Sequence, residues 1–140
     1  MHTERVKVVI DTNVVISAVV SRHGNPAEII EKLVRGNFEN YVSPAIIDEI
    51  KSVLERPNIQ RYSPYEYRKF FLGNFLACSI ITLPKFDEKI VMKDETDNKF
   101  INCALSVNAD IISGDKHLLD LRKFKEVRIF SPREFLERLK

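Results

Sequence analysis

Two aspartates in this sequence each follow a short apolar run and precede a second apolar segment. Asp11 comes directly after the β-branched run at residues 6–10, and Asp115 comes shortly after Ile111 and Ile112. A continuous apolar run suits a strand buried on both faces, so both acids are expected at the carboxyl ends of strands. Open α/β sheets bind ligands just beyond those ends, which makes both carboxylates candidates for chemistry. In the simpler interpretation, each acid only caps the helix that follows it.

Two further carboxylates are expected beside the same edge of the sheet. A helix predicted over residues 43–56 has an apolar stripe, and Glu49 falls at the border of that stripe. Asp97 precedes Phe100 and Ile101 by three and four residues, so it lies on the apolar side of a helix predicted over residues 98–108. The simpler interpretations are a half-exposed surface glutamate and a second helix cap.

Four carboxylates brought to one edge would repel one another unless a cation neutralised them. Hard oxygen ligands suit Mg²⁺ or Mn²⁺, and neither the three histidines nor the two cysteines have zinc-ligand spacing. A site of this kind activates water and stabilises negative charge on a phosphodiester through one or two metal ions. The residues therefore predict a metal site with hydrolytic chemistry at Asp11, Glu49, Asp97 and Asp115.

The elements that position these acids alternate along the chain. Strands are predicted over residues 6–10, 41–42, 80–83, 110–112 and 127–130. Helices are predicted between them, and the one before the last strand is expected over residues 116–123. Capping residues mark helix starts at Asn25, Ser43, Ser63 and Ser131. This alternation predicts an α/β fold: an α/β/α sandwich with a largely parallel central sheet of about five strands.

The helix predicted after Ser63 carries an aromatic stripe of Tyr67, Phe70, Phe71 and Phe75. Aromatic residues at helical spacing indicate a core face or a dimer face. A platform on which nucleic-acid bases stack is the alternative. The segments at residues 56–62 and 85–93 are expected to form loops.

Composition limits the class of protein. The 140 residues predict a single domain over residues 1–140, and 44% apolar with 30% charged residues is ordinary for a globular chain. The net charge of +2 is too mild to indicate a nucleic-acid binder by itself. No signal-peptide segment or membrane-length apolar run is recognised, so no membrane partner and a cytoplasmic location are predicted. Cys78 and Cys103 are expected to be buried thiols.

Four segments, in this order, resemble the PIN-domain ribonucleases, in the branch described as toxin components of toxin–antitoxin pairs. They are VVIDTNVVISAVV, SPAIIDEIKSVL, DETDNKFINCALSVNADIISGDKHLL and IFSPREFL, and together they span nearly the whole chain. The resemblance implies a PIN-like sandwich that is commonly dimeric and cuts single-stranded RNA with Mg²⁺ or Mn²⁺. It also implies an antitoxin protein as a partner.

The resemblance assigns roles to individual residues. It implies Asp11, Glu49, Asp97 and Asp115 as the catalytic, metal-binding acids. Asp94 and Asp120 would be extra acids, and Thr12, Asn13 and Ser113 would support the site. Sequence neighbours of the strand-end acids provide candidates for RNA contact, which are Arg22, Lys116 and His117.

Three other functions are weighed against this one. A phosphatase of the haloacid-dehalogenase type needs a second aspartate two residues after the first, and that position holds Asn13. A receiver domain has paired acids near its first strand, which Arg5, Val6 and Lys7 do not supply. The alternative of another class is a non-catalytic PIN-like module that binds RNA or a protein partner.

Overall fold

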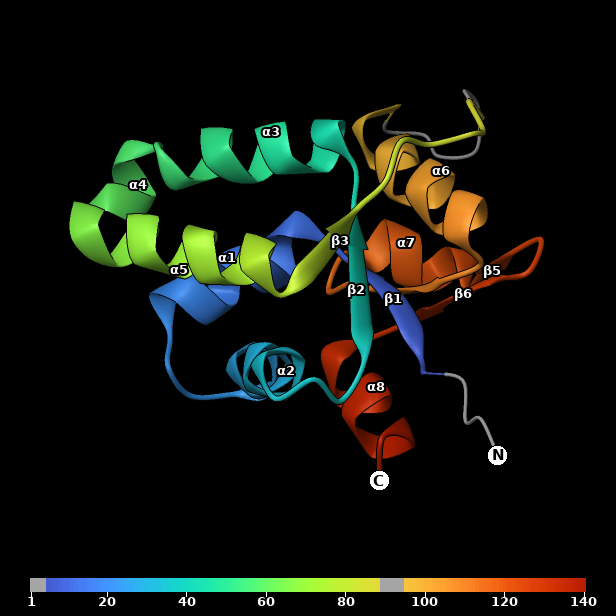
Figure 1. Ribbon diagram of the computed structural model, residues 1–140, viewed down its shortest axis with the longest axis horizontal. Coiled ribbons are helices and arrows are strands. Elements are labelled where there is room, and N and C mark those ends of the chain that lie inside the picture. The colour runs from blue at the N-terminus through green and yellow to red at the C-terminus, as the bar shows by residue number, and fades with distance from the viewer. Residues whose placement is uncertain (1–4, 89–94) are drawn as a thin grey trace.

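The computed structural model describes residues 5–88 and 95–140, which form one sheet with helices on both faces (Figure 1). The sheet has six strands in the order β3-β2-β1-β4-β6-β5. Five of them run parallel: β1 (Lys7–Ile10), β2 (Glu39–Val42), β3 (Ser79–Ile81), β4 (Asp110–Ile112) and β6 (Val127–Phe130). The predicted α/β sandwich is confirmed, with one more strand than the five expected.

The additional strand is β5 (Lys123–Phe124), which pairs antiparallel with β6. This hairpin has no turn signal in the sequence, because its turn residues are Lys125, with a φ of 53°, and Glu126, in place of glycine or asparagine. The helix predicted to reach Lys123 therefore ends earlier, as α7 (Lys116–Leu121).

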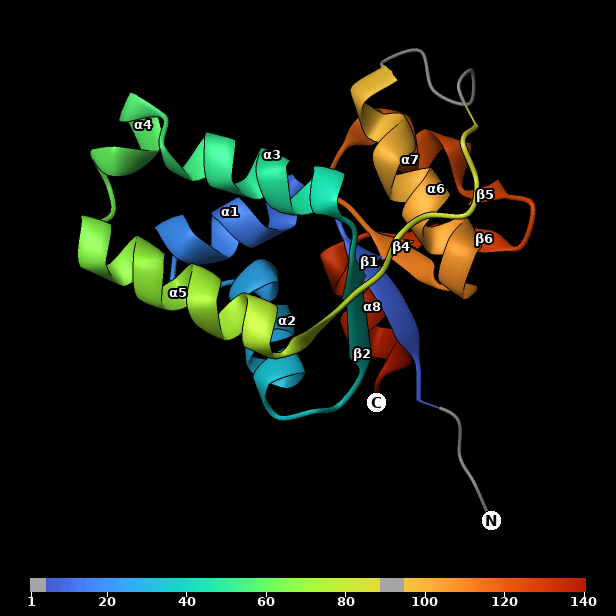
Figure 2. The same ribbon diagram turned by 45° about the horizontal axis from the view of Figure 1, so that its top comes forward.

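Helices cover the sheet on both sides (Figures 1 and 2). One side carries α1 (Thr12–Val20), α2 (Asn25–Val34), α5 (Tyr65–Ala77) and α8 (Pro132–Arg138), with α3 (Pro44–Leu54) packed beside α1. The other side carries α6 (Asn98–Val107), preceded by the short 3-10 helix η1 (Glu95–Asp97), and α7. The longest described helix, α5, has 13 residues, whereas crossing a bilayer takes about 20 apolar ones.

Two of the four predicted helix caps are confirmed. The Ser43 hydroxyl accepts a hydrogen bond from the backbone of α3, and Ser131 forms a complete capping box at the start of α8. The other two predictions are wrong. Gly24, at a φ of 108°, takes the cap position before α2 in place of Asn25, and the Ser63 hydroxyl is buried without a hydrogen-bond partner in the described structure.

A short helix, α4 (Pro57–Gln60), occupies the segment predicted to be a loop at residues 56–62. Proline stops a preceding helix, but it also fits the first turn of a new one, where its missing N–H costs nothing. Pro57 does both, because α3 ends shortly before it and α4 begins with it.

The core confirms the main burial predictions. Val8, Val9 and Ile10 are at most 1% exposed, as expected for a central strand covered on both faces. The aromatic helix α5 is only partly a core helix, since Phe75 is buried while Phe70 is 69% exposed. Both cysteines are free thiols; Cys103 is buried and Cys78 is half-buried. Burial raises the pKa of the Cys103 thiol to about 12.

Candidate functional site

Asp11 and Asp115 follow the two strands, β1 and β4, between which the strand order of the sheet reverses. From β1 the chain proceeds to β2 and β3 on one side, and β4 and β6 lie on the other. Asp11 directly follows β1, and its backbone N–H donates to the Ile112 carbonyl at 2.8 Å, which extends the pairing of β1 with β4. Asp115 follows β4 by three residues. In open α/β sheets, ligands bind in the crevice at this switch point.

Asp11 is a buried carboxylate, 3% exposed, with neutral hydrogen-bond partners. The Ser113 hydroxyl donates to its Oδ2 at 2.6 Å, and the backbone N–H of Asn13 donates to Oδ1 at 3.4 Å. No ion pair to Asp11 exists within residues 5–88 and 95–140. Burial raises the pKa of Asp11, and the nearby charges of Asp115 and Glu49 raise it further, against the opposing hydrogen bonds.

Asp115 is joined to Asp11 through one serine. The backbone N–H of Asp115 donates to the Ser113 hydroxyl at 2.9 Å, and that hydroxyl donates in turn to Asp11. Oδ1 of Asp115 accepts from the backbone N–H of His117 at 2.7 Å and so caps α7. Asp11 likewise caps α1. Both aspartates therefore cap a helix and also lie at the same edge of the sheet.

Glu49 reaches the same edge from α3. The Thr12 hydroxyl donates to its Oε2, and Lys99 Nζ lies 2.7 Å from its Oε1. Because Thr12 directly follows Asp11, these bonds tie α3 and α6 to the end of β1. Sequence reasoning missed Lys99. No local signal pointed to Glu49 as its partner, because Glu95 and Asp97 already supply carboxylates at this helix start.

Asp97 is the last residue of η1 and precedes α6, and it is 9% exposed. Its side chain makes no capping hydrogen bond to α6, so the interpretation as a simple cap is wrong. The helix that it precedes packs against β1, β2 and β4 and also contacts α3. Its second residue, Lys99, makes the ion pair with Glu49.

The remaining predicted residues divide by position. Lys116 and His117 are exposed at the start of α7, directly after Asp115, and Asp120 is exposed farther along α7. Arg22 follows the far end of α1, where its guanidinium lies 5.4 Å from the centroid of the Tyr67 ring, and the structure does not bring it to the acids. Asp94 lies outside the described residues.

Comparison with known proteins identifies the family. The PIN domain family model matches residues 7–117. The chain belongs to the PIN domain family. PIN domains are generally nucleases that use divalent metal ions, so the coarse prediction of a nuclease family is confirmed.

The chain is also similar to one curated protein and to solved structures. The chain is 38% identical to the uncharacterized protein MJ1680 of Methanocaldococcus jannaschii over 146 aligned positions, covering 98% of this chain and 94% of that protein. Its fold is similar to VapBC2 from Rickettsia felis bound to a DNA fragment from their promoter (TM-score 0.60, 14% identity, 89% of this chain and 98% of that one). It is also similar to PAE2754 from Pyrobaculum aerophilum (TM-score 0.67, 16% identity, 96% and 89%).

The side chains of this PIN domain fit a hard cation in their chemistry. The site offers carboxylate oxygens, and the hydrogen-bond partners of the buried Asp11 are neutral, while the charges of Asp115 and Glu49 raise its pKa. The ligand set is not assembled, however. In the part of the chain that the structure describes, no three Asp, Glu, His or Cys side chains are arranged to hold a metal ion. Both oxygens of Glu49 are already engaged by Thr12 and Lys99.

Proposed function

We propose that this PIN domain is a metal-dependent endoribonuclease that cuts single-stranded RNA. Its active site would consist of Asp11, Glu49, Asp97 and Asp115. The observation that carries the proposal is the buried Asp11 carboxylate beside Asp115 at the switch point, with no cation paired to it in the described structure. A buried carboxylate without a counter-charge is costly, so this position gains from a bound cation. Mg²⁺ and Mn²⁺ are the cations that such oxygen ligands prefer.

The residues of the site would have different roles in cleavage. A divalent ion, when bound, would lower the pKa of water and offset charge on the phosphodiester. Asp11 and Asp115 would hold it, with Ser113 fixing the direction of Asp11 through the 2.6 Å hydrogen bond. Lys116 and His117, exposed beside Asp115, would contact RNA phosphates.

A second candidate is a non-catalytic PIN module that binds RNA or a protein. The observation that favours it is the engagement of both Glu49 oxygens, one by Lys99 at 2.7 Å and one by Thr12. With that arrangement retained, Glu49 has no oxygen free of protein partners for a metal. The two candidates differ in whether Lys99 leaves Glu49 when a divalent ion and RNA bind.

A cleavage assay separates the two. Labelled single-stranded RNA is incubated with the protein in Mg²⁺, in Mn²⁺ and in EDTA. We expect cleavage with metal, none in EDTA, and loss of cleavage in Glu49→Gln. Asp48→Asn is the matched control, because Asp48 precedes Glu49 on α3 but is exposed. A wild-type protein that binds RNA and cuts with neither metal would favour the non-catalytic module.

The biological setting is part of the same proposal. We propose a cytoplasmic toxin that forms a homodimer and is held by an antitoxin protein. The resemblance to toxin components supports this setting, as does the likeness in fold to VapBC2 from Rickettsia felis. Light scattering of the purified chain tests the dimer, and co-purification from the native host tests the protein partner.

A further inference from the structure

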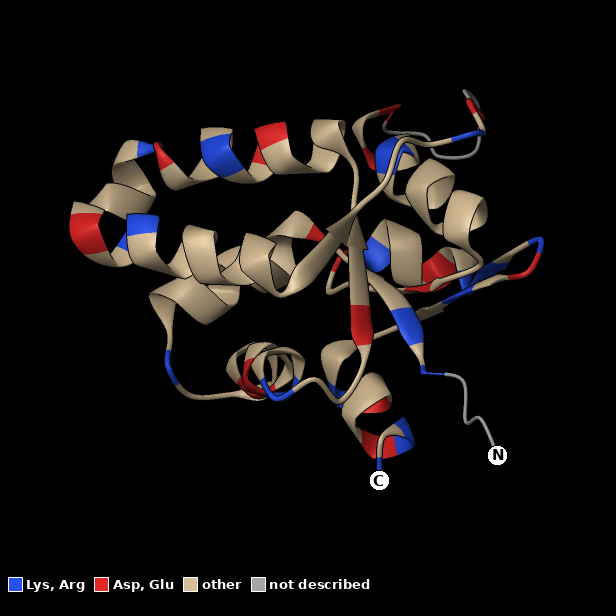
Figure 3. Ribbon diagram, viewed as in Figure 1, with Lys and Arg blue, Asp and Glu red and all other residues tan. Residues whose placement is uncertain are grey.

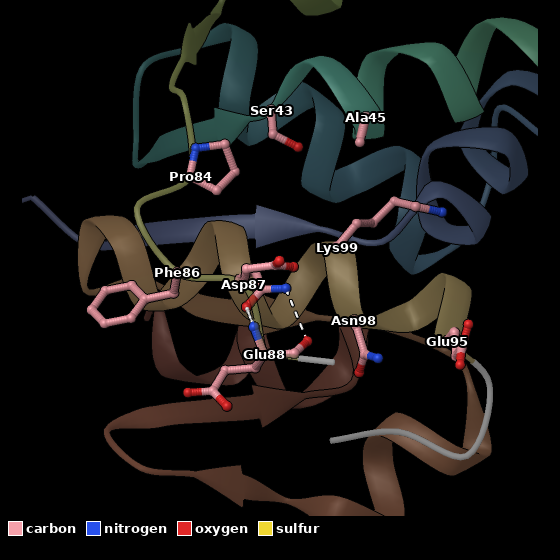
Figure 4. A pocket seen from close by; sticks show the side chains of 10 residues that line it. Ser43, Ala45, Pro84, Phe86, Asp87, Glu88, Glu95, Asn98 and Lys99 are labelled. Carbon is pink, nitrogen blue, oxygen red and sulfur yellow. Dashed lines mark hydrogen bonds between the residues drawn. The ribbon is translucent and has the colours of Figure 1, made fainter. Parts of the chain in front are cut away.

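A pocket of about 520 Å³ opens beside the acids (Figure 4). Its described walls are the start of α3 with Ser43 and Ala45, residues 84–88 after β3, and the segment from η1 into α6, which includes Lys99. Pockets for small organic groups have volumes of roughly 300–1,000 Å³, so this one is large enough for a nucleobase. The proposed chemistry at the acids does not use it.

The wall at residues 84–88 is fixed by hydrogen bonds to α6. The side-chain amide of Asn102 accepts from the Glu88 N–H at 2.7 Å and donates to the Glu88 carbonyl at 3.2 Å. Ser106 accepts from the Lys85 N–H at 2.7 Å. Asn102 is itself buried, and its two bonds to Glu88 are partly buried. The segment is therefore held in place as a wall of the pocket before any ligand arrives.

Lys99 connects the pocket to the acids. Its side chain lines the pocket, and its ammonium lies 2.7 Å from Glu49 Oε1. Ser43, on the opposite wall, caps the helix that carries Glu49. A nucleotide whose phosphate lies at the acids would thus have this pocket next to it.

The lining favours a base over a phosphate. Among the residues that the structure describes, it contains three carboxylates, Asp87, Glu88 and Glu95, and one ammonium, Lys99. Lys99 is paired with Glu49, and Glu88 is paired with Lys125 at 2.9 Å. Negative charge repels phosphate, whereas carboxylates accept hydrogen bonds from base N–H groups, as they do from the amino group of cytosine. Phe86, 44% exposed, stands at the edge of the pocket and offers a ring for stacking (Figure 4).

We propose that this pocket is a nucleobase subsite, which takes a base of single-stranded RNA next to the phosphate held at the acids. The preferred bases are adenine, cytosine and guanine, because each carries an exocyclic amino group that can donate a hydrogen bond to the carboxylates of the lining. Uracil carries two carbonyl oxygens and one N–H, so it fits the lining least. The inference rests on the proposed ribonuclease function and adds a source of sequence preference to it.

The test uses oligoribonucleotides that differ only in the base at each position around the cut. We expect wild type to disfavour uracil about ten-fold at one position, and Phe86→Ala to lower kcat/KM about ten-fold by removing the stacked ring. Ala45→Phe fills the pocket from α3 and should abolish the preference at that position. Phe70→Ala and Ala77→Phe are matched exposed controls on α5 and should behave like wild type.

Equilibrium binding of the same oligonucleotides in EDTA, followed by fluorescence anisotropy, separates the two proposals. If wild type cuts RNA but Phe86→Ala and Ala45→Phe keep its rates and preferences, the subsite is overturned and the nuclease stands. If nothing is cut but binding discriminates against uracil and loses that discrimination in both variants, the subsite stands and the nuclease fails. Displacement of RNA by an arginine-rich peptide that binds wild type but not Ala45→Phe, without base preference, would assign the pocket to a protein partner and overturn the proposal.

Discussion

Two aspartates on neighbouring strands have opposite surroundings. Asp110 begins β4 and is paired in register with Val8 of β1, whereas Asp11 follows the other end of β1. Arg128 binds both oxygens of Asp110, with Nη2 2.9 Å from Oδ2 and Nε 3.3 Å from Oδ1. Asp11 is more deeply buried, and its contacts are a hydroxyl and a backbone N–H.

The two ends of the sheet differ in the same way. The side chains around the amino ends include Arg5, Lys7, Lys123 and Arg128, which line a pocket of about 600 Å³. Figure 3 shows these basic segments at the start of β1 and along the hairpin of β5 and β6. An acid at that end completes an ion pair within the protein. At the carboxyl ends, Glu49 is also paired, with Lys99, but Asp11 has no cationic partner among the described residues. The absence of a cationic partner separates Asp11, a candidate metal ligand, from the structural carboxylate of Asp110.

The largest effect is expected from Asp11→Asn. If Asp11 holds a metal ion, its loss removes several kcal/mol of charge stabilisation, on the order of 100-fold or more in cleavage rate. The folded state should be at least as stable, because the substitution removes a buried charge that has no counter-charge. Cleavage of labelled RNA and urea unfolding of the same preparation measure the two quantities.

Asp110→Asn is the matched control for cleavage, since it makes the same chemical change one strand away. It should cut RNA at the wild-type rate. Equal losses of activity in both variants would mean that the difference in surroundings carries no functional information. An Asp11→Asn protein that folds and still cuts RNA would remove Asp11 from the catalytic site.

The next effect concerns metal binding and stability. A ligand that binds only the folded state adds about 2.7 kcal/mol to the free energy of unfolding at a hundred times its Kd. For a chain of this size, Mn²⁺ should therefore raise the Tm of wild type by roughly 5–15 °C. Asp110→Asn should keep this rise and Asp11→Asn should lose most of it. A rise of the same size in both variants would place the ion elsewhere.

The sequence was a good guide where local rules decide the outcome. The run at residues 6–10 predicted a buried central strand, and the acid after it marked the edge of the sheet. The serine caps at Ser43 and Ser131 were correct because a short polar side chain reaches the backbone of its own helix. Ser63 shows the limit of this rule: its carbonyl accepts from the buried Arg68 guanidinium, and its hydroxyl caps nothing.

Contacts between segments that are far apart in the chain could not be predicted from the sequence. Lys99 and Glu49 are 50 positions apart, and only the packing of α3 against α6 brings them together. The prediction that Arg22 lies near the acids was wrong for a related reason. Sequence proximity to Asp11 suggested spatial proximity, but α1 rises about 1.5 Å per residue and carries Arg22 away from the sheet edge. The pairing of Asp110 with Arg128 likewise depends on β4 and β6 being neighbours.

A smaller effect is expected when the ion pair at the amino ends is broken. Asp110→Ala leaves Arg128 without its bidentate partner. Because the Arg128 side chain is about half exposed, the free energy of unfolding should fall by only about 1 kcal/mol. Urea unfolding at low and high salt measures it, and the loss should shrink as salt screens the pair. A loss of several kcal/mol that does not depend on salt would mean that Asp110 has a packing role and not an electrostatic one.

The finest distinction is the pH dependence of stability without metal. Burial, with Asp115 and Glu49 nearby, raises the pKa of Asp11 above its ordinary value of 3.8. A carboxyl whose pKa is raised on folding contributes stability that is fully present below 3.8 and is lost as the pH rises through the raised pKa. Asp11→Asn does not titrate. Its free energy of unfolding, relative to wild type, should therefore increase with pH across that window and remain constant above it.

Urea unfolding from pH 3.5 to about pH 8 in EDTA gives this difference directly, because the other carboxylates titrate in both proteins and cancel. Asp48→Asn is the control, since Asp48 is an exposed acid on α3. The difference in the free energy of unfolding between Asp48→Asn and wild type should change less with pH than the difference between Asp11→Asn and wild type. A difference for Asp11→Asn that falls as the pH rises would mean that the Ser113 and Asn13 hydrogen bonds outweigh burial. The Asp11 carboxylate would then be stabilised within the protein, as Asp110 is by Arg128, and would have no need of an outside cation.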